Sequence, residues 1–184
     1  GYHGMEPVRV GNQAHEHLQH DVYGQIVLPL VQAFYDQRMI RPGTLEDFEA
    51  LERVGQRAFE MHDQPDAGLW EFRTFARVHT YSSVMCWAAC DRLAKAALHL
   101  GLKDRAADWA RKARTIRTRI EAETYREEEG HFAASFGGDE LDASLLQLTD
   151  VGFLPANDRR MARTFEVIER DLKKGPFLFR YVEP

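Results

Sequence analysis

The feature that most constrains this chain is an apolar side chain at every fourth position near its N-terminus. Between residues 15 and 39 these side chains are Leu18, Val22, Ile26, Leu30 and Phe34. A step of four residues places them on one stripe of a long helix. Pro29 lies inside that stripe, so we expect a kink or a local bend there.

The rest of the chain shows the same helical period. Thr44 is a suitable N-cap with Asp47 at the third helical position, which predicts a helix running to about Met61. Its core-facing side chains should be Leu45, Phe48, Leu51, Val54 and Ala58. Further helices are expected over 80–100, 104–126, 142–149 and 158–173, with an irregular segment at 69–78 and an extended one at 177–182. Six helices and almost no strand signal predict an all-α fold.

Composition excludes several classes of protein. The 184 residues are enough for one domain with a real core, and the formal net charge of −5 disfavours a nucleic-acid binder. The longest apolar run, residues 26–31, is far too short to span a membrane. With two cysteines a disulfide framework is not expected, and a cytoplasmic location fits. No secretory signal pattern is present in residues 1–7.

Two groups of residues suggest a metal site and fail on closer reading. His15, Glu16 and His20 nearly spell a His-Glu-x-x-His motif, but position 19 is Gln and the two histidines lie about 140° apart on a helix. Cys86 and Cys90 could join His79, yet they continue an apolar stripe at helical spacing that favours core packing. We therefore expect no metal and no cofactor.

The irregular segment at 66–73 is the strongest candidate for chemistry. Glu71 stands directly beside Trp70 in a loop, where partial desolvation would raise the pKa of the carboxyl and suit a general acid. Trp70 could stack on a sugar ring, and Arg73 could hold a substrate hydroxyl or stabilise Glu71 as a carboxylate. The alternative is a Trp that anchors a helix connection, with Glu71 and Arg73 as a solvated pair.

Six stretches of this chain together resemble glycoside hydrolase family 15, the glucoamylase and bacterial trehalase group. They occur in the family's order over nearly the whole chain. They are 7–14 (PVRVGNQA), 19–24 (QHDVYG), 68–73 (GLWEFR), 79–87 (HTYSSVMCW), 141–146 (LDASLL) and 152–156 (GFLPA).

The resemblance implies an (α/α)6 barrel, whose helical hairpins form two concentric rings, and inverting hydrolysis of α-glucosidic bonds from a chain end. Glu71 matches the family's general acid, and Trp70 and Arg73 match the neighbouring pocket wall. Asp21, Tyr23 and Asp142 fall at motif positions that line the sugar pocket. The implied substrate is an α-glucoside such as trehalose or a maltooligosaccharide.

The resemblance also implies an incomplete site. The family's general base lies beyond the equivalent of this chain, and six helices are about half of a closed barrel. Residues 1–184 would then form one partial catalytic domain, truncated at both ends and inactive alone, that is poorly soluble or forms homo-oligomers through uncovered helix faces. The alternative is a non-catalytic helical-hairpin module that binds protein or carbohydrate, favoured by the Ala-rich stretch 93–120. An open cleft at Trp70 and Glu71 would favour the enzyme.

Overall fold

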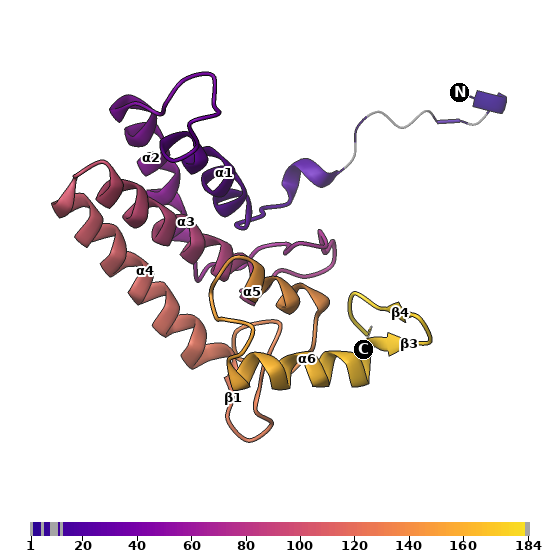
Figure 1. Ribbon diagram of the computed structural model, residues 1–184. Coiled ribbons are helices and arrows are strands. Elements are labelled where there is room, and N and C mark those ends of the chain that lie inside the picture. Colours follow the sequence, from indigo (N-terminus) through magenta and orange to yellow (C-terminus); the bar gives the residue numbers. More distant parts are fainter. Residues whose placement is uncertain (1, 5, 8–10, 12, 183–184) are drawn as a thin grey trace.

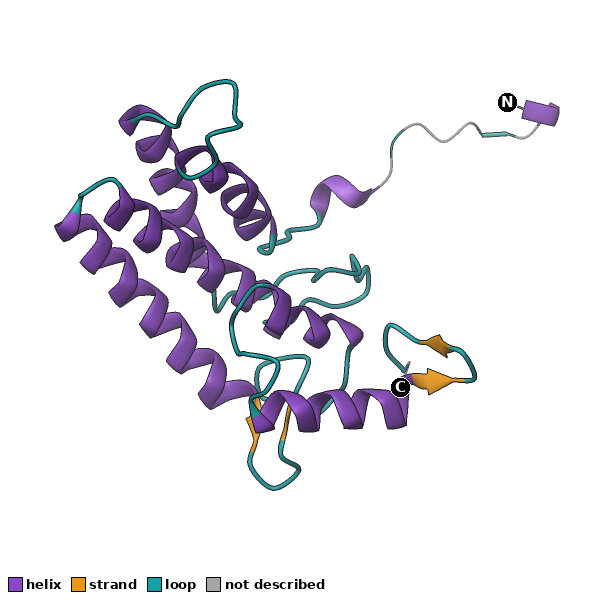
Figure 2. Ribbon diagram, in the orientation of Figure 1, coloured by secondary structure: helices purple, strands orange, loops and turns teal. Residues whose placement is uncertain are grey.

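The computed structural model describes residues 2–4, 6–7, 11 and 13–182, and most of them are helical (Figures 1 and 2). The α-helices are α1 (Val22–Leu30), α2 (Leu45–Met61), α3 (Thr80–His99), α4 (Lys103–Thr124), α5 (Gln147–Asp150) and α6 (Arg159–Leu172). The 3-10 helices are η1 (Tyr2–Gly4), η2 (Gln13–Glu16), η3 (Val31–Phe34) and η4 (Ala143–Leu146). The short strands are β1 (Tyr125–Arg126), β2 (His131–Phe132), β3 (Lys173–Lys174) and β4 (Phe177–Leu178), which form two antiparallel hairpins. The all-α prediction is confirmed.

Helix α3 is the centre of the molecule. It packs along α4 as an antiparallel hairpin and is also contacted by α1 and α2 (Figure 1). Fourteen of its twenty residues are buried, including Ala88, Ala89, Ala96 and Ala97. Small side chains let neighbouring helices approach closely, and the backbone of α1 at Gly24 packs directly on Met85. The helical hairpins predicted from sequence are therefore present.

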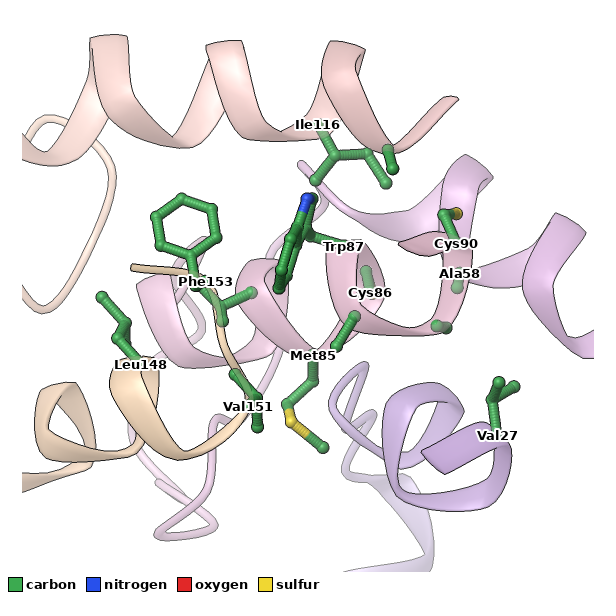
Figure 3. Packing of buried hydrophobic residues seen from close by; sticks show 14 of the residues in the cluster. Val27, Ala58, Met85, Cys86, Trp87, Cys90, Ile116, Leu148, Val151 and Phe153 are labelled. Carbon is green, nitrogen blue, oxygen red and sulfur yellow. The ribbon is translucent and has the colours of Figure 1, made fainter. Parts of the chain in front are cut away.

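The core continues from α3 to α4 and the α5 region (Figure 3). The rings of Trp87 and Phe153 meet edge to face with centroids 5.1 Å apart, a favoured aromatic geometry. Cys86 and Cys90 are fully buried free thiols among these apolar side chains. Burial raises the pKa of the Cys90 thiol to about 12. The two cysteines thus act as small core residues, as their helical spacing predicts.

Helix α2 begins as its sequence predicts. Thr44 and Asp47 form a reciprocal capping box, in which each side chain accepts a hydrogen bond from the other residue's backbone N–H. Phe48, Leu51 and Ala58 are buried, and Val54 is half-buried. Leu45 is exposed, so its assignment to the core was wrong. It is the first residue of the helix.

The first helix differs most from its prediction. It begins at Val22 rather than near residue 15, and just after Pro29 it continues only as the 3-10 turn η3. Of the predicted stripe, Leu18, Val22, Ile26 and Leu30 are exposed, and only Phe34 is buried. Contact of Gly24 with α3 turns a neighbouring face inward, so Val27 and Val31 are buried instead. In the part of the chain that the structure describes, no helix is long and apolar enough to cross a membrane.

Candidate active site

A cleft of about 940 Å³ opens beside the N-terminal end of α3. Four segments far apart in sequence form its walls: residues 70–79 before and at the start of α3, the stretch 134–142, the end of α6 at 171–172, and the end of the described chain at 181–182. The predicted residues that line it are Trp70, Glu71, Arg73 and Asp142. The structure thus brings together four of the six predicted site residues.

Glu71 occupies an unusual backbone conformation. Its φ is +55°, in the left-handed region that residues other than glycine rarely adopt. Its N–H donates to the carbonyl of Gly68 at 3.1 Å, and Phe72 N–H donates to Ala67 at 2.9 Å, so a tight turn presents Glu71 to the cleft. The side chain is exposed. Among the described residues, the partial burial expected for Glu71 beside Trp70 is therefore not found.

The indole of Trp70 is fixed by a carboxylate. Its Nε1 donates to Asp142 Oδ2 at 2.7 Å, and Asp142 Oδ1 accepts from the backbone N–H of Ser144 at 2.7 Å. The Arg180 guanidinium lies 5.3 Å from the centroid of the indole ring, within reach of a cation–π interaction. Asp142 therefore has two structural roles. It caps η4, as its sequence position predicts, and its hydrogen bond to the indole sets the orientation of Trp70.

Aromatic rings form the inner wall of the cleft. Phe72 stacks on His79 with ring centroids 5.5 Å apart and on Phe75 at 4.5 Å, and its ring also lies 5.0 Å from Tyr181. A backbone hydrogen bond of 2.8 Å from Ala143 N–H to the carbonyl of Arg180 holds the end of the chain in place. The wall is apolar, whereas the rim carries carboxylates and guanidinium groups.

Two titratable groups of the cleft have shifted pKa values. Burial lowers the pKa of His79, and the charges of Asp66 and Asp142 only partly offset that effect. Burial acts to raise the pKa of Glu140, but hydrogen bonds and the ion pair with Arg77 outweigh it and lower the pKa. Near neutral pH the cleft therefore holds an uncharged imidazole and an ionised Glu140.

Asp21 and Tyr23 do not line this cleft. Asp21 is buried before α1, where burial raises the pKa of its carboxyl and Gln25 donates a hydrogen bond to it. Tyr23 is half-buried, with its ring stacked on His20 at 6.2 Å between centroids. Their assignment to the sugar pocket stays a prediction.

The candidate metal ligands are separated. Cys86 and Cys90 are buried in the core, and His15 is exposed on η2. Within the described ranges, no three His, Cys, Asp or Glu side chains are placed to hold a metal ion. In the stretch 7–14 that carries part of the family resemblance, residues 8–10 and 12 lie outside the described residues.

The sequence did not identify His79 and Tyr181 as cleft residues, nor the contact of Arg180 with Trp70. His79 entered only as a metal candidate and within the stretch 79–87, and 177–182 only as an extended segment. Isolated bridges pair His79 with Ser135 and Asp142 with Tyr181. Such pairings join residues that are distant in sequence, so no local spacing of residues predicts them. The cluster of aromatic and basic residues at 177–182 was the one available signal.

Comparison with known proteins identifies the family of the chain. The sequence model of "Glycosyl hydrolases family 15" matches residues 1–183. A trehalase of Thermoplasma acidophilum is 36% identical over 180 residues, which cover 98% of this chain and 30% of the relative. A trehalase of Mycobacterium tuberculosis is 36% identical over 185 residues, which cover 98% of this chain and 26% of the relative. The chain thus spans about a quarter to a third of these relatives.

The fold has a counterpart among solved structures. A protein described as "Glycosidase F290Y" superposes with a TM-score of 0.77 over 94% of this chain and 45% of its own, at 20% sequence identity. That likeness shows the fold, a part of the same helical architecture. The match of the family model over residues 1–183 shows that the chain belongs to glycosyl hydrolases family 15.

Proposed function

We propose that this chain is the acid-bearing part of an inverting α-glucoside hydrolase that removes glucose from a chain end. The observation that carries the proposal is the placement of Glu71, which a strained left-handed turn presents to a cleft beside the fixed indole of Trp70. A residue held in a costly backbone conformation at a cleft is a frequent mark of function. This placement favours an enzyme over a module in which Trp70 merely anchors a helix connection.

In the proposed reaction, Glu71 donates its proton to the glycosidic oxygen as the bond from that oxygen to C1 of glucose breaks. Water attacks C1 from the opposite face, and its proton passes to a second carboxylate about 6.5–9.5 Å from the acid. Trp70 and Arg73 would bind the glucose unit beside that bond, with Asp142 holding the indole in place. The second carboxylate would come from a part of the enzyme outside residues 1–184, so the isolated chain should be inactive.

The nature of the relatives supports trehalose as the first substrate to test, because the curated relatives named above are trehalases. Maltooligosaccharides are the other α-glucosides that such a cleft could accept. We place the enzyme in the cytoplasm, in line with its two free buried thiols.

The test is Glu71→Gln in the complete enzyme that contains this chain, assayed on trehalose and maltose. Loss of a general acid lowers turnover by about 10²–10⁴-fold, and the exposed Glu71 should be replaced without loss of folding. The matched control is Glu128→Gln, an exposed carboxylate in the turn between β1 and β2. Near-wild-type turnover in Glu71→Gln would remove Glu71 from the acid role.

We also propose that the isolated chain self-associates through α1. Val22, Ile26 and Leu30 form a continuous apolar stripe on that helix and are all exposed. Replacing Ile26 and Leu30 by Lys should shift the chain toward monomer in size-exclusion chromatography with light scattering. Leu98→Lys on α3, where the leucine is more exposed than either of these residues, is the control and should leave association unchanged. A wild-type chain that is monomeric at high concentration would contradict the proposal.

A further inference from the structure

The loop that carries Trp70 and Glu71 is closed at its base by Asp66. The backbone N–H of Asp66 donates to the carbonyl of Arg77 at 2.9 Å, and Arg77 N–H donates back to Asp66 at 3.2 Å. Between these two residues, 71 and 73–76 are exposed. The conformation of the loop therefore depends on a small number of polar contacts. They include this pair at its base, the bond from Ala67 N–H to the carbonyl of Leu18 at 2.8 Å, and the bonds that join Gly68 to Gln19 and Trp70 to Asp142.

The side chain of Asp66 connects this base to the helical core. It is 1% exposed, and its Oδ2 accepts hydrogen bonds from the backbone N–H of His20 at 2.8 Å and from Ser82 Oγ at 2.7 Å. His20 precedes α1 and Ser82 lies in the first turn of α3. Hydrogen bonds to a carboxylate are among the stronger ones in proteins, so one side chain ties the loop to both helices.

A second set of contacts connects the base of the loop to Glu71. Residue 68 packs so closely on the His79 ring that an added Cβ would lie 2.7 Å from it, and the same ring stacks on Phe72. Glu71 lies between these two residues, and its N–H bonds to the Gly68 carbonyl. Asp66 itself does not line the cleft, so any effect on the reaction must act through the position of the loop.

We propose that Asp66 is the positioning residue of the proposed general acid, because it fixes the loop 66–77 against α1 and α3 and thereby sets where Glu71 points. This inference rests on the proposed function of Glu71. A small displacement of a catalytic group can lower the rate by about 100-fold, whereas loss of general stability affects every substrate alike.

The experiment uses two substrates of the complete enzyme that differ in leaving group. Trehalose needs a proton from the acid, and α-D-glucosyl fluoride does not, since fluoride leaves without protonation. Asp66→Ala should lower kcat on trehalose by about 10–100-fold with little change on the fluoride. Asp66→Asn keeps an acceptor for His20 and Ser82, so it should retain most of the trehalose activity.

Two further variants guard against a failure of Asp66→Ala to fold. Ser82→Ala removes one of the two donors and should show a smaller loss that is again confined to trehalose. Ser83→Ala is the matched control, because this neighbouring buried serine donates to the carbonyl of His62 instead. It should show no loss that depends on the substrate.

A double variant separates the inference from the proposed function. If Asp66 acts only through Glu71, Asp66→Ala causes no further loss on trehalose when Glu71 is already Gln. Two results would overturn the positioning role alone. One is an equal loss of activity on trehalose and on the fluoride, and the other is full activity on trehalose in both Asp66→Ala and Ser82→Ala. Full trehalose activity in Glu71→Gln would overturn the proposed function itself.

Discussion

Helix α3 and the loop 66–78 adjoin at His79, yet they are held in place by different kinds of interaction. Helix α3 is buried along most of its length, with Leu93 and Ala97 fully covered by neighbouring helices. In the loop, by contrast, six of thirteen residues are exposed, and hydrogen bonds of Asp66 and of Trp70 help to fix it. Burial of apolar surface thus stabilises the scaffold, whereas a few polar contacts determine the shape of the candidate site.

The largest effect should come from the scaffold. Phe153→Ala removes a ring that is 1% exposed and packs on Trp87, and such truncations cost about 3–5 kcal/mol. The control is Phe177→Ala, because Phe177 is 70% exposed and should change stability by less than about 0.5 kcal/mol. Urea unfolding followed by circular dichroism measures both. Similar losses in the two variants would contradict the contrast between core and surface.

A smaller loss is expected at the polar contact that holds Trp70. Asp142→Ala removes the cap of η4 and the acceptor of the indole N–H, for a combined cost of about 2 kcal/mol. Asp158 caps α6 without contacting Trp70, so Asp158→Ala should cost less. Urea unfolding and the tryptophan fluorescence of the folded state test this. An unchanged fluorescence in Asp142→Ala would show that the indole does not depend on this carboxylate.

The strained turn predicts a gain in stability. Glycine at position 71 would relieve the left-handed strain, worth about 1–2 kcal/mol, while its extra freedom in the unfolded chain offsets about 0.5–1 kcal/mol. Glu71→Gly should therefore stabilise the chain by up to about 1 kcal/mol and abolish the activity of the complete enzyme. Thermal unfolding measures the stability of Glu71→Gly. The control is Glu128→Gly, which places a glycine at an exposed turn position. A destabilised Glu71→Gly would argue against strain at this residue.

The smallest expected effect depends on pH. Burial raises the pKa of Asp21 above its ordinary value of 3.8, so the folded state binds this proton more tightly than the unfolded state does. Stability then falls as pH rises through that range, and ionised Asp21 is unfavourable at pH 7. Asp21→Asn should be more stable than the parent chain at pH 7 and equal to it near pH 3. Urea unfolding at both pH values tests this, and a gain that is the same at both would contradict it.

The sequence predicts the scaffold well because helix signals are local. The Thr44–Asp47 capping box and the helical spacing of Cys86, Cys90 and Leu93 depend on neighbours along the chain, and the structure confirms both. The buried face of α1 was harder to assign. Its apolar stripe suggested a contact surface, but the close approach of Gly24 to α3 selects another face.

The candidate site is harder to predict from the sequence than the helices are. Trp70 and Glu71 could be singled out from their neighbours, but the acceptor of the indole N–H is 72 residues away at Asp142. The left-handed backbone conformation of Glu71 could not be predicted from the sequence. Residues other than glycine seldom adopt it, so the residue type gives no indication of it. The role of Asp66 depends on His20, 46 residues before it, and on Ser82 in the following helix. Only the fold brings these groups together.

The central claim is that Glu71 protonates the glycosidic oxygen. The most direct measurement is a crystal structure of the complete enzyme with a sulfur-linked trehalose analogue that cannot be hydrolysed. If Glu71 is the acid, one of its carboxylate oxygens lies within hydrogen-bond distance of the linking sulfur, on a loop still closed by Asp66 and Arg77. A linking atom held by another carboxylate, with Glu71 directed into solvent, would contradict it.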